Sequence, residues 1–145
     1  MEIQKNISDV ACSFFIIQEN KIAIAEINLY PKEMLTNYLE EVKANKTNIE
    51  TVFQKTDKTY FFNRLNVPEK MRNQGLGALL LKEVLDFVAS ENGILVNTVN
   101  AYGDLSQKEL INWYEKHGMT VGNKQGLLFY HSDLKPQNRP KQKLR

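Results

Sequence analysis

A glycine-bearing loop between a strand pattern and a helical pattern constrains this chain more than any other feature. The loop reads Arg72-Asn73-Gln74-Gly75-Leu76-Gly77-Ala78, and a candidate strand at residues 59–67 ends before it at Pro68. After the loop, Gly93 is typical of a helix C-terminus, and apolar residues recur at helical spacing: Leu76, Leu79, Leu80, Val84, Phe87 and Val88. The predicted order is therefore strand, short loop and helix.

The start of this helix has the properties of an anion site. The first N–H groups of a helix have no partner within it, and the helix dipole adds partial positive charge there. Gly75 and Gly77 lack a Cβ, so the main chain can approach a ligand closely, and Arg72 adds a permanent charge. A phosphate group fits such a site well. Taken alone, the loop is equally compatible with a plain strand-to-helix turn.

Two familiar phosphate-binding patterns do not match this loop. A Walker loop requires Lys and Ser or Thr at the helix start, where this chain has Gly-Leu-Gly-Ala. A dinucleotide fingerprint requires a third glycine three places after Gly77, where the chain has Leu80. The pattern that does match is Arg-x-x-Gly-x-Gly, which resembles the pyrophosphate loop of the GNAT family of N-acetyltransferases.

A second motif strengthens this resemblance. The stretch Trp113-Tyr114-Glu115-Lys116-His117-Gly118-Met119 is similar to the family's helix end Tyr-Glu-Lys-x-Gly-Phe, with Met119 in place of Phe. The two motifs stand in the family's order with a strand between them, and the resemblance covers roughly residues 59–131. The N-terminal third departs from the family's usual plan, because a hairpin comes first and only one helix is indicated.

The remaining patterns predict a mixed α/β (α+β) fold. Strands are indicated at residues 12–17, 21–29, 49–54, 59–67, 93–100, 119–121 and 126–130, and the first four predict two hairpins. Further helices are expected at residues 31–44 and 105–118, the latter with Ser106 and Glu109 as a capping box. The resemblance implies a GNAT-like, mostly antiparallel central sheet with helices on both faces and a splayed central strand pair.

Composition indicates an ordinary soluble globular domain. At 145 residues the chain predicts one domain, and no apolar run approaches the roughly 20 residues needed to cross a bilayer. The N-terminus lacks a signal-peptide pattern, and the single cysteine, Cys12, is expected to be a buried inert thiol in a reducing cytoplasm. With His117 and His131 as the only histidines, no metal-ligand spacing is present. We therefore expect a cytoplasmic protein with no membrane contact and no metal.

The net charge of +2 is unevenly distributed. Residues 135–145 carry five basic and no acidic residues, so residues 1–134 carry a net charge of −3. We expect an acetyltransferase-like domain at residues 1–134 and a basic, flexible tail at residues 135–145. The tail's composition also allows a nucleic-acid contact, but without interleaved aromatic residues a solvated end is the preferred interpretation. The oligomeric state stays open, with a homodimer among the alternatives.

The resemblance implies transfer of an acetyl group from acetyl-CoA to a primary amine by direct attack. It implies that Leu65, Asn66 and Val67 pair with the pantetheine arm and that residues 72–78 hold the pyrophosphate. Tyr114 matches the family's general acid, although it is also compatible with a plain core aromatic. Ser106 is chiefly a helix cap, with contact to the cofactor as a weaker implication. The acceptor is an amine-bearing small molecule or protein.

The polar ends of two predicted strands, at Asn66 and at Asn97 and Asn100, indicate that these strands face a cleft. Residues 59–67 nevertheless contain no carboxylate to act as a general base. The remaining candidates, Glu26, Glu69 and Asp104, are more typical of exposed surface carboxylates. An acceptor amine with a low pKa needs no base. The alternative is a non-catalytic or weakly active CoA-binding regulatory module of the same fold.

Overall fold

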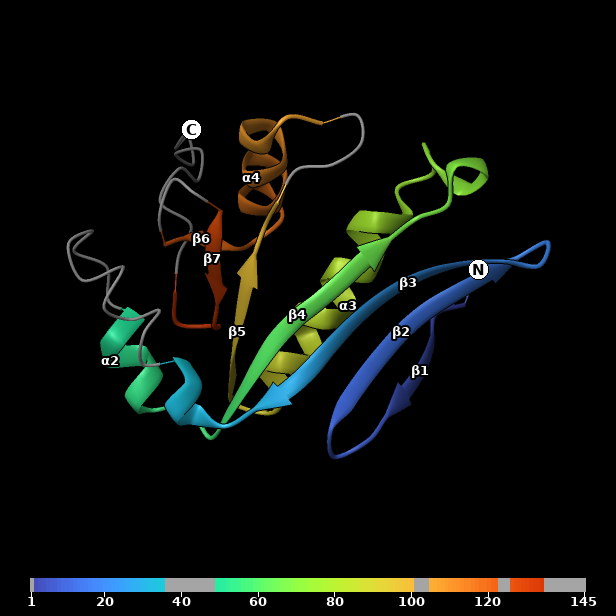
Figure 1. Ribbon diagram of the computed structural model, residues 1–145. Helices are drawn as coiled ribbons and strands as arrows, with labels where there is room; N and C mark the ends of the chain where they lie inside the picture. Colours follow the sequence, from blue (N-terminus) through green and yellow to red (C-terminus); the bar gives the residue numbers. More distant parts are fainter. Residues whose placement is uncertain (1, 36–48, 101–104, 123–125, 135–145) are drawn as a thin grey trace, which may run out of the picture.

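Within the described chain, seven strands form one sheet in the order β1-β2-β3-β4-β5-β7-β6 (Figure 1). The computed structural model describes residues 2–35, 49–100, 105–122 and 126–134. The strands are β1 (Gln4–Ile7), β2 (Ala11–Gln18), β3 (Lys21–Tyr30), β4 (Lys58–Asn66), β5 (Gly93–Thr98), β6 (Thr120–Val121) and β7 (Leu127–Tyr130). Neighbouring strands are antiparallel except β4 and β5, which run parallel. The predicted mixed, mostly antiparallel sheet is therefore confirmed.

Helices cover both faces of this sheet. They are the 3-10 turns η1 (Lys32–Leu35) and η3 (Glu69–Met71) and the α-helices α2 (Ile49–Gln54), α3 (Leu76–Ser90) and α4 (Gln107–Lys116). α3 contacts β2, β3, β4 and β5, and its apolar side shares one core cluster with Phe14 and Ala25. α2 packs on the other face, where Val52 and Phe53 share a second cluster with Phe129. The expectation of helices on both faces is confirmed.

The first predicted hairpin is β2–β3. Its inward side chains alternate along each strand, and Phe14, Ala23 and Ala25 are fully buried. Glu19 and Asn20 in the turn both have positive φ, which suits a tight connection between antiparallel strands. β1 extends the hairpin to a third strand that the sequence did not indicate, because its residues are all exposed and show no alternation.

The strand predicted at residues 49–54 is wrong, because this segment forms the helix α2. Its β-branched residues favoured a strand, but Val52 and Phe53 are both buried in the same cluster, at 1% and 7% exposure. Successive side chains of a strand point to opposite faces, whereas neighbours on a helix can share a packed side. The second predicted hairpin is therefore absent, and β4 pairs with β3 instead.

The end of α3 also differs from the prediction. Asn92 takes the left-handed conformation with φ of 50°, whereas Gly93 begins β5. A Cβ on Gly93 would lie 2.9 Å from Cε2 of Tyr60, so packing rather than helix capping requires glycine there. The predicted buried side of α3 is also partly wrong. Leu79 was included in it but is 40% exposed, whereas Leu81 was left out and is buried.

Three predicted features lie partly or wholly outside the described residues. They are the helix at residues 31–44, of which only η1 is described, the candidate base Asp104, and the basic tail at residues 135–145.

Candidate functional site

Strands β4 and β5 are paired over only part of their length. Their parallel pairing ends at Phe61 and Val96, although β4 continues to Asn66 and β5 to Thr98. Beyond that point, the side of β4 that faces β5 has no strand partner in the described chain. The predicted splayed pair is therefore present, and its open edge can pair with an extended ligand.

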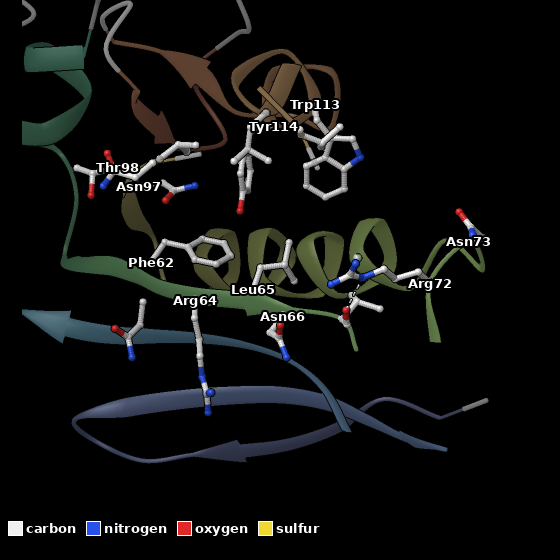
Figure 2. A pocket seen from close by; sticks show the side chains of 17 residues that line it. Phe62, Arg64, Leu65, Asn66, Arg72, Asn73, Asn97, Thr98, Trp113 and Tyr114 are labelled. Carbon is white, nitrogen blue, oxygen red and sulfur yellow. Dashed lines mark hydrogen bonds between the residues drawn. The ribbon is translucent and has the colours of Figure 1, made fainter. Parts of the chain in front are cut away.

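A cavity of about 660 Å³ lies where the two strands separate (Figure 2). Its walls come from the second half of β4, the loop before α3, the end of β5 and the side of α4. The lining residues are Phe62, Asn63, Arg64, Leu65, Asn66, Val67, Arg72, Asn73, Gly77, Asn97, Thr98, Val99, Asn100, Leu105, Leu110, Trp113 and Tyr114. The polar strand ends at Asn66, Asn97 and Asn100 face this cavity, as the sequence predicted.

A β-bulge in β4 decides which of its side chains face which side of the sheet. Ile27 of β3 pairs with Phe62, but the next residue, Glu26, pairs with Arg64, so Asn63 is the extra residue. The extra residue shifts the alternation by one position. Leu65 therefore packs on the same core cluster as Phe62, whereas Arg64 lies on the opposite face beside Glu26.

The loop before α3 has the free main-chain donors that the sequence predicted. Gly75 is the N-cap with φ of 74°, no side chain caps the helix, and the N–H of Leu79 makes the first helical bond, to the oxygen of Gly75. The three preceding N–H groups therefore have no helical acceptor. Arg72 Nε donates to the carbonyl of Val67 at 2.9 Å, which holds the guanidinium beside β4.

The predicted cofactor residues divide into two groups. Leu65, Asn66, Val67, Arg72, Asn73 and Gly77 line the cavity, whereas Gln74, Gly75, Leu76, Ala78 and Ser106 do not. The Leu76 side chain is in the core at 3% exposure, so only its main chain can contact a ligand. Ser106 Oγ accepts from the N–H of Glu109 at 3.1 Å, and the Glu109 carboxylate accepts from the N–H of Ser106. The predicted capping box is confirmed, and a contact of Ser106 with a cofactor stays a prediction.

Tyr114 belongs both to the core and to the cavity wall. It is 8% exposed, and its ring makes edge contacts with Phe62 at 6.1 Å and with Trp113 at 5.1 Å between centroids. Its hydroxyl points from α4 toward β4 at the opening between the strands (Figure 2). The two interpretations drawn from the sequence are thus compatible, because the ring packs while the hydroxyl faces the cavity.

Sequence reasoning missed several lining residues, chiefly Trp113 and Arg64. Trp113 stands inside the second motif and could have been found there, since α4 presents it beside Tyr114. The Trp113 ring lies against Gly77, where an added Cβ would be 3.7 Å from Trp113 Cζ2. The centroids of the Trp113 and His117 rings are 4.5 Å apart. His117 is the C-cap of α4, and its Nδ1 bonds the Trp113 carbonyl at 2.8 Å, so this histidine packs at the helix end. Arg64 carried no local signal, because its orientation depends on the bulge.

Charge in the cavity is of one sign. Among the described lining residues, the charged side chains are Arg64 and Arg72, with no carboxylate and no histidine. Of the candidate bases, Glu26 accepts hydrogen bonds from Asn63 and Arg64 without lining the cavity, and Glu69 is exposed in η3. Because Glu26 pairs with Arg64, Arg72 is the cation without a paired carboxylate among the described lining residues, and the end of the cavity at Arg72 therefore favours anionic ligands.

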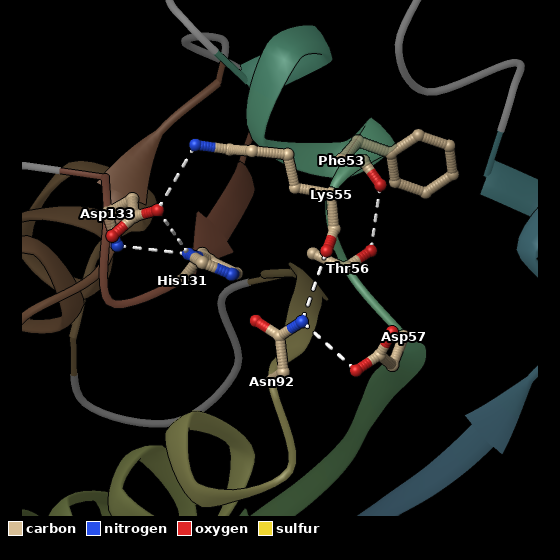
Figure 3. A network of polar contacts seen from close by, with 7 residues as sticks. All are labelled: Phe53, Lys55, Thr56, Asp57, Asn92, His131 and Asp133. Atoms are coloured by element: carbon tan, nitrogen blue, oxygen red, sulfur yellow. Dashed lines mark hydrogen bonds and ion pairs between the residues drawn. The ribbon is translucent and has the colours of Figure 1, made fainter.

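A separate polar cluster surrounds His131 after β7, close to α2 (Figure 3). His131 is 3% exposed, and its Nδ1 accepts from the N–H of Asp133 at 2.9 Å, which leaves the proton on Nε2. Nε2 is buried, and no described residue forms a hydrogen bond with it. Burial lowers the pKa of His131 from 6.5, opposed by the Asp133 carboxylate 4.0 Å away and assisted by Lys55. The folded protein therefore favours neutral His131.

We expect this histidine to make the protein less stable in mild acid. The pKa of His131 is lower in the folded protein than in the unfolded protein. The contribution of this histidine to the free energy of unfolding is therefore fully present above about pH 6.5, and it is lost as the pH falls through the folded pKa. Urea unfolding can be measured at one pH above 6.5 and at one pH below the folded pKa of His131. The free energy of unfolding should decrease more between these two pH values in the native protein than in His131→Leu. Thr120→Val, which removes a buried hydroxyl that does not titrate, should keep the native pH dependence. The same pH dependence in His131→Leu would refute the assignment.

One comparison with known proteins, the one against family models, agrees with this geometry. The sequence model described as the Acetyltransferase (GNAT) family matches residues 2–119. The match includes the N-terminal strands, which the sequence motifs left outside the resemblance. No curated protein and no solved structure matches the chain. Within the described residues, no helix is long and apolar enough to cross a membrane, and no group of His, Cys, Asp and Glu side chains could hold a metal ion.

Proposed function

Because the chain belongs to the Acetyltransferase (GNAT) family, we propose that it transfers an acetyl group from acetyl-CoA to a primary amine by direct attack. The observation that carries the proposal is the position of Tyr114 on a cavity that opens where β4 and β5 separate. That cavity brings together an open strand edge, a hydroxyl and a positively charged loop. An extended amide-bearing arm that ends in a diphosphate, as CoA has, needs this combination.

The donor fits the residues present. The open edge of β4 at Leu65–Val67 supplies main-chain groups for the amides of the pantetheine arm. The unpaired N–H groups at the start of α3, together with Arg72, supply donors for the diphosphate. Asn73 and Gly77 line the cavity between these parts.

The reaction needs two reactants in line and a proton for the leaving sulfur. The amine nitrogen attacks the thioester carbonyl, the new C–N bond forms, and the C–S bond breaks with its electron pair on sulfur. Tyr114 gives its hydroxyl proton to the sulfur, and the proton of the amine passes to solvent, from which Tyr114 is reprotonated. A main-chain N–H of β4 would bind the developing oxyanion. Holding both reactants supplies much of the acceleration without a strong base.

The test is incubation with acetyl-CoA and a panel of amines that differ in pKa and charge. Release of free CoA thiol and a matching acetylated amine, seen by mass spectrometry, support the proposal. Thiol release without acetylated amine would indicate thioester hydrolysis and contradict amine transfer.

A second candidate is a CoA-binding regulatory module without turnover. The observation that favours it is the absence of a carboxylate or histidine among the described residues that line the cavity. Calorimetry would then show CoA binding, while no amine in the panel, including those with a low pKa, becomes acetylated.

Arg72→Gln should weaken CoA binding about tenfold or more, the effect of losing a hydrogen bond to a charged group. Binding of pantetheine, which lacks the diphosphate, should not change. Lys70→Gln is the matched control, because Lys70 is an exposed cation two residues away that does not line the cavity. Calorimetry measures all three proteins, and an equal loss of pantetheine binding would show that Arg72 acts through the Val67 carbonyl rather than through the diphosphate.

A further inference from the structure

Asn97 is a buried polar side chain in the wall of the cavity. It is 5% exposed, and it lines the cavity at the end of β5. The other amide and threonine side chains that line the cavity in the described chain are all exposed: Asn63, Asn66, Asn73, Thr98 and Asn100. Burying an amide costs free energy unless new partners replace its hydrogen bonds to water. The burial of Asn97 therefore calls for a partner that the exposed amides do not need.

The strand register places Asn97 where β4 and β5 separate. Their parallel pairing ends at Val96, so Asn97 is the first residue of β5 beyond it, while β5 still pairs with β7 at Leu128. Side chains alternate along a strand, and Leu95, two residues earlier, belongs to the core cluster that contains Tyr114. Asn97 therefore points to the face of the sheet on which α4 presents Tyr114. Figure 2 shows the Asn97 amide and the Tyr114 hydroxyl at the same opening.

One end of the Asn97 amide is held, and the other end is left for a ligand. Nδ2 donates to Sδ of Met119 at 3.9 Å, which is the only hydrogen bond of this side chain among the described residues. A thioether sulfur can accept a hydrogen bond but has no proton to donate, so the NH2 end of the amide faces Met119 and Oδ1 does not. Met119 is joined to α4, because its N–H donates to the carbonyl of Tyr114 at 3.1 Å. Oδ1 is thus an unpaired acceptor on the packed unit that carries Tyr114.

The proposed reaction has one donor without an assigned acceptor, which is the N–H of the attacking amine. The amides of the pantetheine arm have the open edge of β4, and the diphosphate has the loop before α3. No carboxylate and no histidine lines the described cavity to receive the amine. As the nitrogen bonds to the thioester carbon it gains positive charge, so its N–H becomes a stronger donor. A fixed carbonyl oxygen at that nitrogen stabilises the transition state more than the ground state.

We propose that Asn97 binds the attacking amine, with Oδ1 accepting a hydrogen bond from the amine N–H. This contact directs the lone pair of the nitrogen toward the thioester carbonyl. A neutral amide does not take the proton, which passes to solvent as in the mechanism above. Asn97 is therefore an orienting group and not a general base, and a cavity without a carboxylate can still receive an amine. The inference rests on the proposed acetyl transfer and names the residue that contacts the acceptor nitrogen.

The competing explanation is that Asn97 only fills the wall between β5 and α4. A structural role predicts that its loss lowers stability and affects turnover only through the fold. An amide buried with a sulfur as its partner is a poor stabiliser, because much of its desolvation is not repaid. Asn97→Leu keeps the branching of the side chain and removes both polar atoms. We expect its urea midpoint to stay at the native value or to rise, while turnover falls.

Kinetics measure the expected loss. Asn97→Leu should lower kcat with the best amine of the panel about 10- to 100-fold, the range of a hydrogen bond to a charged group, and should leave CoA affinity unchanged. Asn97→Ala, which cannot crowd the wall, should show the same loss. Thr59→Val is the matched control, because the Thr59 hydroxyl is also buried and forms no hydrogen bond among the described residues, but does not line the cavity. It should keep the native kcat.

Two outcomes of these measurements would overturn the proposal. The first is native kcat in Asn97→Leu or in Asn97→Ala. The second is weaker CoA binding with unchanged kcat, which would mean that Oδ1 accepts from an amide of the pantetheine arm rather than from the amine.

A binding experiment tests the same contact without turnover. Two CoA thioethers carry either an N-methylacetamide or an N,N-dimethylacetamide group on sulfur, so that they differ by a single N–H at the acceptor nitrogen. The native protein should bind the N–H compound about tenfold more tightly, as expected for one hydrogen bond, and Thr59→Val should keep this preference. Asn97→Leu should bind both compounds equally. Equal binding of both compounds by the native protein would overturn the proposal.

The two experiments together separate failure of this inference from failure of the proposed function. If the native protein prefers the N–H compound through Asn97 but acetylates no amine, acetyl transfer fails and the assignment of Asn97 stands. If amines are acetylated while the native protein binds both compounds equally, transfer stands and the assignment of Asn97 fails. A protein that binds neither compound contradicts both.

Discussion

Tyr114→Phe is expected to lower kcat for acetyl transfer about 100-fold, the lower end of what a positioned acid contributes. The sulfur of CoA, whose thiol has an ordinary pKa of about 8.5, leaves more easily when a positioned hydroxyl gives it a proton. The substitution keeps the aromatic ring, and with it the contacts to Phe62 and Trp113. Affinity for CoA and the unfolding free energy should therefore stay close to the native values, so that the loss is confined to the chemical step.

Tyr130→Phe is the matched control for this experiment. Tyr130 is a partly buried tyrosine on β7 that does not line the cavity, and burial raises the pKa of its hydroxyl. Its loss should leave kcat unchanged. Steady-state rates with acetyl-CoA and calorimetry with CoA give both quantities. Native turnover in Tyr114→Phe would remove the hydroxyl from the mechanism while leaving the proposed binding of the donor intact.

Gly126→Ala is expected to destabilise the fold by roughly 3 kcal/mol. Gly126 has φ of 113°, and an added Cβ would lie 2.3 Å from the carbonyl oxygen of Val99 and 2.6 Å from Nε2 of Gln107. The first contact is with main chain, which cannot rotate away. The Val99 N–H also donates to the Gly126 oxygen at 2.7 Å, so the substitution pushes apart the end of β5 and the start of β7.

Gly75→Ala is the control for the backbone part of this effect. Gly75 also has positive φ, at 74°, but an added Cβ meets no atom within 4 Å. Strain alone should cost about 1 kcal/mol there. Urea unfolding compares the two variants, and equal losses would show that crowding at Val99 has no role. Because Val99 lines the cavity, Gly126→Ala should also weaken CoA binding.

The parts of the site that could be predicted are those with a signal inside a few residues. The loop at residues 72–78 shows its glycines and arginine in the sequence, and its free donors follow from the start of any helix. The capping box of Ser106 and Glu109 is equally local, as is the alternation of β2 and β3. The splayed strands came from resemblance to a family, since nothing in the local pattern shows that two strands part.

The errors arose where burial depends on a distant partner. Residues 49–54 have the composition of a strand, but they form a helix. Val52 and Phe53 both pack in the cluster that contains Phe129, and two successive side chains can share a packed side in a helix but point to opposite faces in a strand. Asn92 rather than Gly93 takes the left-handed conformation after α3, and Gly93 instead lies against Tyr60, which leaves no space for a Cβ. In both cases a tertiary contact outweighed a local preference.

The sequence by itself indicated most of the strands and helices, although it missed β1 and predicted a strand in place of α2, and it predicted an anion site at the start of α3. These predictions follow from preferences between near neighbours along the chain. The tertiary structure alone decided which side chains share the cavity. The register between β3 and β4 turns Arg64 toward Glu26, and the packing of α4 brings Tyr114 and Trp113 to the open strands. These side-chain orientations depend on contacts between residues far apart in the chain, which a pattern of neighbouring residues does not reveal.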